Sequence, residues 1–193
     1  MFRNKSNLRK VVAIAICLAG VTMFLGCNPN DDPIDENPPI GNGGDDNTST
    51  KEGGVVINGI RWATRNVGSS GTFVSSSVLY GNYYTFYEAQ SVCPKGWRLP
   101  TKQEMQRLVN AGSTWTIYNG HTGRIFGSGS NTLFLPAAGD KYGSASKCGE
   151  YWTSSSMNND YGWSLFFDSN GADADNYRSN KSLMSMCIRC VAE

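Results

Sequence analysis

Residues 93–112 read CPKGWRLPTKQEMQRLVNAG, and this stretch has the pattern of a capped helix. Thr101 is followed three residues later by Glu104, which is the spacing of a capping box at a helix N-terminus. Gly112 is suited to end the helix. The apolar stripe between these signals consists of Met105, Leu108 and Val109. The pattern predicts a helix between Thr101 and Gly112.

Two further elements are expected on the N-terminal side of this helix. Residues 55–64 predict a hairpin, because Asn58 and Gly59 suit a two-residue turn between two apolar runs. Residues 83–93 have apolar side chains at roughly helical spacing and predict a short helix that Pro94 ends. The apolar positions are Tyr84, Tyr87, Ala89 and Val92.

The helical signals cease after Gly112. Residues 113–131 are rich in Gly, Ser, Thr and Asn and predict a loop, with a short strand at 124–126. Strand-like runs follow as LFLPAAG (133–139), EYWTSSS (150–156), WSLFFD (163–168) and MCIRCVAE (186–193). We therefore expect an α+β fold in which two short helices pack on antiparallel strands, with long loops between them.

The N-terminus has the pattern of an export signal. Four basic residues precede the apolar run 11–26, which is shorter than the roughly 20 residues that a spanning helix prefers. Leu25, Gly26 and Cys27 resemble the lipobox of bacterial lipoproteins, although Phe24 departs from the commoner leucine. This resemblance implies a signal peptide at 1–26 and lipidation of Cys27, which anchors the protein to a membrane. The alternative is an uncleaved membrane anchor.

Residues 28–50 carry six acidic residues, no basic residue and four prolines. Such a segment buries too little apolar surface to offset its ordering entropy, so residues 27–53 are interpreted as a lipidated cysteine with a disordered tether. The acidic cluster Asp31, Asp32, Asp35 and Glu36 resembles the signal that directs Bacteroidetes lipoproteins to the exterior face of the outer membrane. A solvated spacer without such a signal is the alternative. Residues 54–193 are the expected globular domain.

The charge of the chain argues against a nucleic-acid partner. From Lys51 onward there are 13 basic and 10 acidic residues, and the basic ones are scattered. Nucleic-acid binding requires a clustered basic face or stripe.

The chain has six cysteines, of which Cys17 is lost with the signal peptide and Cys27 carries lipid in this interpretation. The remaining four are Cys93, Cys148, Cys187 and Cys190. In an exported protein they predict two disulfides, for which three connectivities exist. A zinc site is the alternative, because Cys187 and Cys190 have a C-x-x-C spacing, but no second close pair accompanies them.

Five motifs together resemble a known family. They are INGIRWATRNVG (57–68), CPKGWRLPTKQEM (93–105), LPAAG (135–139), GEYWTSSS (149–156) and IRCV (188–191). Their order resembles the Fibrobacter succinogenes major paralogous domain, which belongs to the wider C-type-lectin-like fold, and the resemblance covers residues 54–193. It implies a last strand near the first, with Trp97 and Trp152 in the core.

The resemblance also implies a disulfide between Cys93 and Cys190, which leaves Cys148 and Cys187 as the second pair. Cys187 and Cys190 are expected on opposite faces of one strand, because they are an odd number of residues apart. The family implies no activity.

Two departures from related proteins bear on function. The chain lacks the Glu-Pro-Asn or Gln-Pro-Asp and Trp-Asn-Asp triplets of calcium-dependent lectins, so no metal site is expected. The GWRLPT stretch is also similar to formylglycine-generating enzymes, whose activity depends on a copper-binding cysteine pair. Because the cysteines here are interpreted as structural, that activity is a distant alternative.

No catalytic constellation stands out in the sequence. The chain has one histidine, His121, and its GSG at 127–129 lacks the lysine of a phosphate-binding loop. Four carboxylates could supply an acid and a base, but the sequence does not bring them together: Asp140, Glu150, Asp160 and Asp168. We expect no enzyme, no catalytic residue and no cofactor.

Residues 157–182 have the composition of a recognition surface, since 15 of the 26 residues are Asn, Asp, Ser or Tyr. The candidate ligand-binding residues are Tyr161, Tyr177, Asn159, Asp160, Asn176 and Arg178. The expected partner is a glycan, peptide or protein, and an ordinary polar loop is the bland alternative. A structural subunit of a surface assembly is the alternative function.

Overall fold

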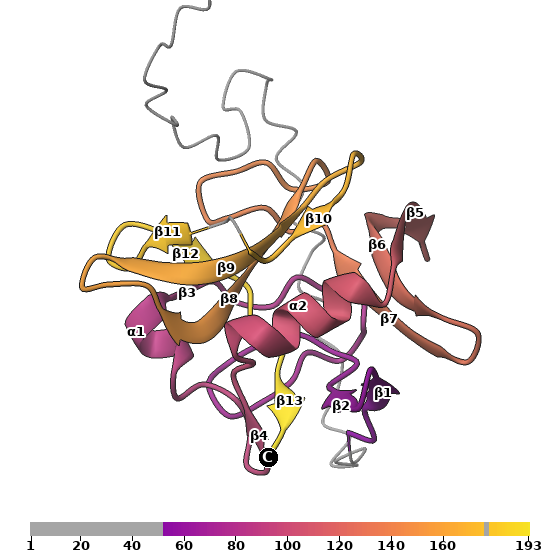
Figure 1. Cartoon of the computed structure of the whole chain (residues 1–193), viewed down its shortest axis with the longest axis horizontal. Helices are drawn as coiled ribbons and strands as arrows, with labels where there is room; N and C mark the ends of the chain where they lie inside the picture. Colours follow the sequence, from indigo (N-terminus) through magenta and orange to yellow (C-terminus); the bar gives the residue numbers. More distant parts are fainter. Residues whose placement is uncertain (1–51, 176–177) are drawn as a thin grey trace, which may run out of the picture.

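The computed structural model describes residues 52–175 and 178–193. The signal peptide, Cys27, most of the tether, Asn176 and Tyr177 lie outside these residues. The described part is rich in antiparallel sheet and has two short helices, so the α+β class is confirmed (Figure 1). No helix in this part of the chain is long and apolar enough to span a membrane.

The predicted N-terminal hairpin is confirmed. Strands β1 (Val55–Ile57) and β2 (Ile60–Trp62) pair in antiparallel fashion. The turn residues Asn58 and Gly59 have φ angles of 47° and 79°, the positive values that a tight hairpin turn requires. Strand β13 (Val191–Ala192) lies between β2 and β4 (Trp97–Arg98), so the last strand pairs with the first hairpin as expected.

Helix α2 (Lys102–Asn110) begins where its sequence predicts. The Thr101 hydroxyl accepts a hydrogen bond from the Glu104 backbone, and the Glu104 carboxylate accepts one from the Thr101 backbone. Arg98 adds an ion pair with Glu104 at 2.6 Å. The hydrogen bond from Arg98 is the main reason why the pKa of Glu104 is lowered to about 2.

The predicted helix at 83–93 is wrong over most of its length. Helix α1 (Phe86–Ala89) has only four residues and starts at a second capping box, formed by Thr85 and Glu88. The residues before it form strand β3 (Tyr84–Thr85), which pairs with β12 (Ser185–Met186). Tertiary pairing with a distant strand therefore overrides the local helical spacing.

The predicted loop at 113–131 is also wrong, although the short strand predicted at 124–126 is confirmed as part of β6. The segment forms β5 (Ser113–Tyr118) and β6 (His121–Ser128), which continue into β7 (Asn131–Pro136) as a three-stranded sheet. Asn119 and Gly120 have φ angles of 47° and 83°, so they repeat the turn geometry of the first hairpin. Cross-strand pairing in this sheet stabilises a segment whose composition is typical of loops.

The second large sheet is built around β9 (Tyr161–Phe167). It pairs with β8 (Gly149–Ser156) on one side, and with β10 (Ala172–Asp173) and β11 (Arg178–Asn180) on the other. Trp152 on β8 is fully buried and its indole donates to the Tyr84 carbonyl, whereas Trp97 is partly buried against Phe73. The core lies between this sheet, α2 and the β1–β2 hairpin.

The predicted disulfide between Cys93 and Cys190 is present, with Cα atoms 6.1 Å apart. The predicted pairing of Cys148 with Cys187 is wrong, because Cys187 carries a free thiol buried in the core. Tyr151 lies beside Cys187, and Cys148 precedes Tyr151 by three residues, about 10 Å along a strand. A disulfide requires Cα atoms within about 7 Å.

Cys187 and Cys190 also do not share a strand, since β12 ends at Met186 and β13 starts at Val191. Between them lies Arg189, which is fully buried. Its guanidinium donates to the Asn66 side chain at 2.8 Å and to the Ala63 carbonyl at 3.1 Å. Burial lowers the pKa of Arg189 to about 10.

The chain is tied down where its described part begins. The Glu52 carboxylate accepts hydrogen bonds from the Thr64 backbone and hydroxyl and pairs with Arg65 at 2.8 Å. Burial opposes its ionisation, but these bonds outweigh burial and lower the pKa of Glu52. Gly54 follows with a φ of 68°, and a Cβ there would lie 2.8 Å from the Trp62 carbonyl oxygen. We call Glu52, β1, β2, β4 and β13 the Glu52 pole, which lies at the bottom of Figure 1.

Candidate functional site

About half of the described residues of the segment 157–182, which the sequence marks for recognition, lie in strands. Its longest exposed stretch is the turn 157–160 between β8 and β9. The Asn158 side chain accepts hydrogen bonds from the backbone of Asp160 at 3.0 Å and of Tyr161 at 2.8 Å. These bonds fix the backbone of the turn.

The Lys181 side chain is hydrogen-bonded to this turn. Its ammonium donates to the Ser156 hydroxyl at 2.7 Å and to the Asn158 carbonyl at 2.6 Å. The same ammonium lies 4.8 Å from the centroid of the Phe86 ring. Although Lys181 is charged, it is buried. Lys181 therefore connects the turn 157–160 to Phe86 of α1.

Helix α1 is seated against β9 by a close contact. A Cβ at Gly162 would lie 2.4 Å from the Phe86 ring, so only glycine allows this approach. Phe86 and Ala89 face the core, while Tyr87 points outward and its hydroxyl donates to the Asn159 carbonyl at 3.5 Å. The packing of Phe86 therefore sets the position of Tyr87.

Apolar side chains gather on the surface beside α1. Tyr87, Tyr142 and Leu183 are 59%, 67% and 64% exposed, and Met157 is also exposed. The Tyr142 hydroxyl donates to the Leu183 carbonyl at 2.9 Å. Phe86 N donates to the Lys181 carbonyl, which connects α1 to the segment that carries Leu183.

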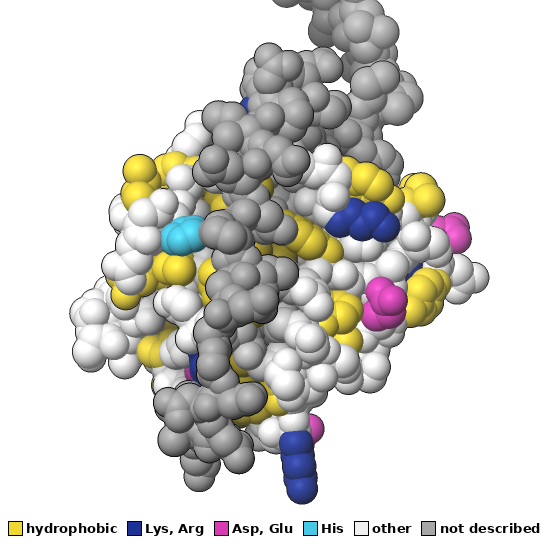
Figure 2. Space-filling model, turned by 180° about the vertical axis from the view of Figure 1, so that it is seen from behind, with side chains coloured by type: hydrophobic (Ala, Val, Ile, Leu, Met, Phe, Trp, Pro, Cys, Tyr) yellow, Lys and Arg dark blue, Asp and Glu magenta, His cyan; other side chains and the backbone are white. Residues whose placement is uncertain are grey.

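We call this surface the Tyr87 face; it comprises Tyr87, Tyr142, Met157, Asn159, Asp160 and Leu183. Hydrophobic, acidic and basic side chains lie together on the side that carries α1, at the right of Figure 2. Within the described part of the chain, the side chains of Asn159 and Asp160 make no hydrogen bond, and both residues are exposed. The face thus combines apolar area with polar groups open to solvent.

The sequence-predicted residues divide into three groups. Asn159 and Asp160 lie on the Tyr87 face, while Tyr161 is half-buried on β9 and Arg178 lies on β11 opposite Trp163. Asn176 and Tyr177 lie outside the described residues. Sequence reasoning missed Tyr87 and Tyr142 as surface aromatics. The capping box at Thr85 fixes where α1 begins, but it does not decide which of its side chains are exposed.

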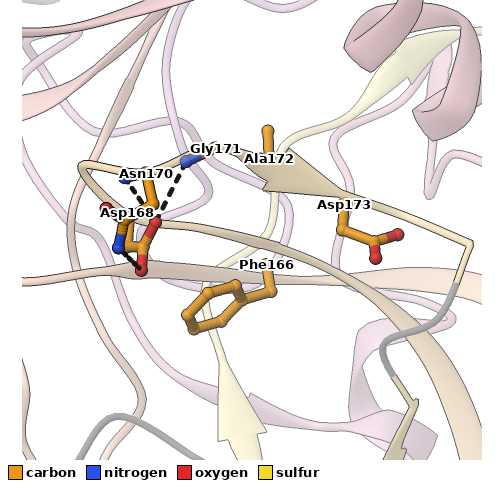
Figure 3. Close-up of a pocket in the computed structure, with 6 residues that line it drawn as sticks. All are labelled: Phe166, Asp168, Asn170, Gly171, Ala172 and Asp173. Carbon is orange, nitrogen blue, oxygen red and sulfur yellow. Dashed lines mark hydrogen bonds between the residues drawn. The ribbon is translucent and has the colours of Figure 1, made fainter. Parts of the chain in front are cut away.

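A second, shallower feature is a depression of about 280 Å³ at the β9–β10 turn. Figure 3 shows its lining residues, which are Phe166, Asp168, Asn170, Gly171, Ala172 and Asp173. The Asp168 carboxylate accepts hydrogen bonds from the backbone of Asn170 at 2.7 Å and of Gly171 at 3.1 Å. Asp168 therefore shapes the turn that forms the rim.

The structure brings two of the four predicted carboxylates together. Burial, and secondly the charge of Asp140, raise the pKa of Glu150 to about 7. Asp160 and Asp168 lie at two other turns. His121 begins β6 and makes an edge contact with Tyr80 at 6.4 Å between ring centroids. Among residues 52–175 and 178–193, no group of three or more His, Cys, Asp or Glu is placed to hold a metal ion.

On the opposite side of the β9 sheet from α1's Phe86, Trp163 meets α2. The Lys102 ammonium lies 3.6 Å from the Trp163 ring centroid and 3.4 Å from the Asp175 carboxylate. One face of this indole is therefore already covered by the protein's own cation. Cations lie farther from the rings of Tyr142 and Tyr87, at 5.2 Å and 6.0 Å from the ring centroids, so these rings are less covered.

No family model, curated protein or solved structure matches this chain.

Proposed function

We propose that this chain is an exported lipoprotein, anchored in the outer membrane through Cys27 and facing the cell exterior. Its C-type-lectin-like domain binds a glycan, peptide or protein ligand through the Tyr87 face. The protein acts as a binding module and catalyses no reaction.

The Tyr87 face carries this proposal. Exposed tyrosines supply rigid contact area with a polar tip, and amide and carboxylate groups beside them supply hydrogen bonds, which is the chemistry of recognition surfaces. Because Lys181 and Asn158 already fix the turn 157–160, little conformational entropy is lost there on binding. The surface is thus preorganised for a ligand.

The anchor is supported by the sequence. The basic leader, the apolar run 11–26 and the Leu25-Gly26-Cys27 motif favour cleavage before Cys27 and acylation of its thiol. The acidic cluster after Cys27 favours display on the outer face.

The lectin-like assignment is supported by two features. The order of the five motifs resembles that family, and the disulfide that the resemblance implies, Cys93 to Cys190, joins the segment after α1 to the residue before β13. The neighbouring positions of β13 and β2 agree with the same arrangement.

The binding experiment uses the full chain in detergent on an array of glycans and surface proteins. For any ligand found, Tyr87→Ala and Leu183→Ala should each weaken binding, and a central aromatic can contribute about 2 kcal/mol or more. Val56→Ala is the matched control, because Val56 is exposed at the Glu52 pole. Binding should survive chelation of calcium. Full affinity in both variants would place the site elsewhere.

The anchor is tested separately by intact-mass analysis of membrane-extracted protein. We expect a chain that begins at an acylated Cys27, and we expect Cys27→Ser to release the protein from the membrane. An unmodified Cys27 or a retained Met1 would overturn the anchor without affecting the binding proposal.

A further inference from the structure

Strand β5 is an open edge of the β5–β6–β7 sheet. It has six residues, pairs with β6 on one side and forms the outermost strand of this sheet (Figure 1). None of its residues makes a hydrogen bond across the other side within the described part of the chain. The backbone donors and acceptors on that side therefore have no backbone partner among residues 52–175 and 178–193.

The direction of each backbone group follows from one hydrogen bond. Gly127 N donates to the Gly112 carbonyl at 2.9 Å, so Gly112 faces β6. Backbone groups alternate along an antiparallel strand, so Thr114, Thr116 and Tyr118 also face β6. The N–H and C=O groups that point outward belong to Ser113, Trp115 and Ile117.

This edge lacks the features that usually prevent strand pairing. Its sequence, STWTIY, contains no charged residue and no proline, and its register with β6 is unbroken from Ser113 to Tyr118. Proteins normally protect an edge with lysine, proline or a bulge. Ile117 is 71% exposed and Tyr118 is also exposed, which adds apolar area beside the open backbone groups.

We propose that β5 pairs antiparallel with β5 of a second copy of this chain, about a two-fold axis at Trp115. In an antiparallel pair of identical strands, the numbers of two residues that face each other add up to a constant. With the two-fold axis at Trp115, that sum is 230. Trp115 then faces Trp115 of the second copy, and Ser113 faces Ile117. All three outward-facing residues are thereby paired in both copies, and a six-stranded sheet results.

The chemistry favours a second copy as the occupant. The outward-facing residues are evenly spaced about Trp115, so two copies can pair through all three of them. This edge carries no charge, so two copies meet without repulsion. Thr114 and Thr116 become cross-strand neighbours, a pairing that stabilises sheets. Because α1 lies on the opposite side of the molecule from β5, the dimer leaves both Tyr87 faces open (Figure 1).

The first test measures the oligomeric state of the full chain in detergent by sedimentation velocity across a range of concentrations. Ile117→Pro removes an outward N–H and leaves the β6 pairing intact, since proline is tolerated at such edge positions. Wild type and the control Ile117→Val should dimerise, whereas Ile117→Pro should be monomeric with an unchanged circular dichroism spectrum. A monomeric wild type, or a dimeric Ile117→Pro, would overturn the proposal.

The second test fixes the register. Thr114 and Thr116 of two copies face each other with Cα atoms about 4.5 Å apart, within reach of a disulfide. A mixture of Thr114→Cys and Thr116→Cys chains should form a cross-linked heterodimer under mild oxidation, and neither variant alone should cross-link through these positions. Cross-links in the single variants, or none in the mixture, would exclude this pairing, as would a wild-type monomer that binds an unrelated β-strand peptide.

Discussion

The Glu52 pole and the Tyr87 face are both rich in polar side chains, but they use them differently. At the Glu52 pole, the carboxylate of Glu52 accepts three hydrogen bonds from two residues, and the disulfide of Cys93 with Cys190 lies beside β13. At the Tyr87 face, the inner polar group, Lys181, is satisfied, while Asn159 and Asp160 face solvent. Polar groups that are hydrogen-bonded within the domain stabilise the fold. Polar groups that face solvent beside exposed aromatic rings are the ones that we propose to bind a ligand.

The largest stability effect should come from Cys93→Ser. The bond to Cys190 spans 97 residues, and chain-entropy estimates for such a loop give roughly 4–5 kcal/mol. Chemical denaturation measures the loss in the free energy of unfolding.

Cys187→Ala is the control for this experiment, because Cys187 is a free thiol that behaves as a small buried apolar side chain. It should cost about 1 kcal/mol or less. A loss as large as that of Cys93→Ser would indicate that Cys187 forms a disulfide after all.

Lys181→Met should have the next largest effect. It keeps an unbranched apolar side chain but removes two charge-assisted hydrogen bonds and the ammonium over the Phe86 ring, so it should cost about 2–3 kcal/mol. Hydrogen exchange should show faster opening of the turn 157–160. Lys102→Met is the matched control and should cost less than about 1 kcal/mol, because its ion pair is partly exposed. Equal losses in the free energy of unfolding of both variants would show that the hydrogen bonds of Lys181 to the turn contribute no more than an exposed ion pair.

Glu52→Gln should cost about 1–2 kcal/mol at neutral pH, since the Arg65 pair and two hydrogen bonds weaken. In the unfolded chain Glu52 takes up a proton near pH 4.5, whereas the folded protein holds its pKa lower. The unfolded state therefore binds more protons below that pH, and acid lowers the stability of the wild type.

The variant has no carboxyl group at this position. Its stability should therefore fall less between about pH 5 and about pH 3, the interval around the ordinary pKa of glutamate. Thermal unfolding across this range measures the difference. Parallel curves for wild type and variant would show that the Glu52 contacts contribute nothing to acid sensitivity.

The smallest stability effect should come from Tyr87→Ala. Its ring is mostly exposed and makes one long hydrogen bond, so the free energy of unfolding should change by less than about 0.5 kcal/mol. Together with a loss of binding, this outcome separates a contact residue from a structural one. A large loss of stability would instead make Tyr87 part of the structural frame.

Elements with complete local signals were predictable. The capping box of Thr101 and Glu104 and the Asn58-Gly59 turn define α2 and the first hairpin without help from the rest of the chain. The Asn119-Gly120 turn carried the same signal, but its flanking strands are rich in Thr, Ser and Gly. The composition of these strands therefore favours a loop, although the three strands pair with one another through two turns.

The candidate site was predictable only in part. Asn159 and Asp160 follow from composition, because they lie in a segment of polar recognition residues. Tyr87 could not be assigned in the same way, since its exposure depends on Phe86 packing over Gly162 and on Lys181. These contacts join residues about 75–95 positions apart, which no local pattern reports.

If the chain is tethered through Cys27, the Glu52 contacts are the first to bear a pulling force. A ligand pulled away from the cell loads the domain at the point where the tether enters. The load first reaches the Glu52–Arg65 pair and then the β1–β2 hairpin, which can unzip from Val55 and Trp62 toward its turn. Beyond Trp62, Ala63 N is bonded to the Cys190 carbonyl, and Cys190 is joined covalently to Cys93. These contacts can therefore yield one after another and absorb extension, while the bond between Cys93 and Cys190 limits that extension to the residues that precede Cys93.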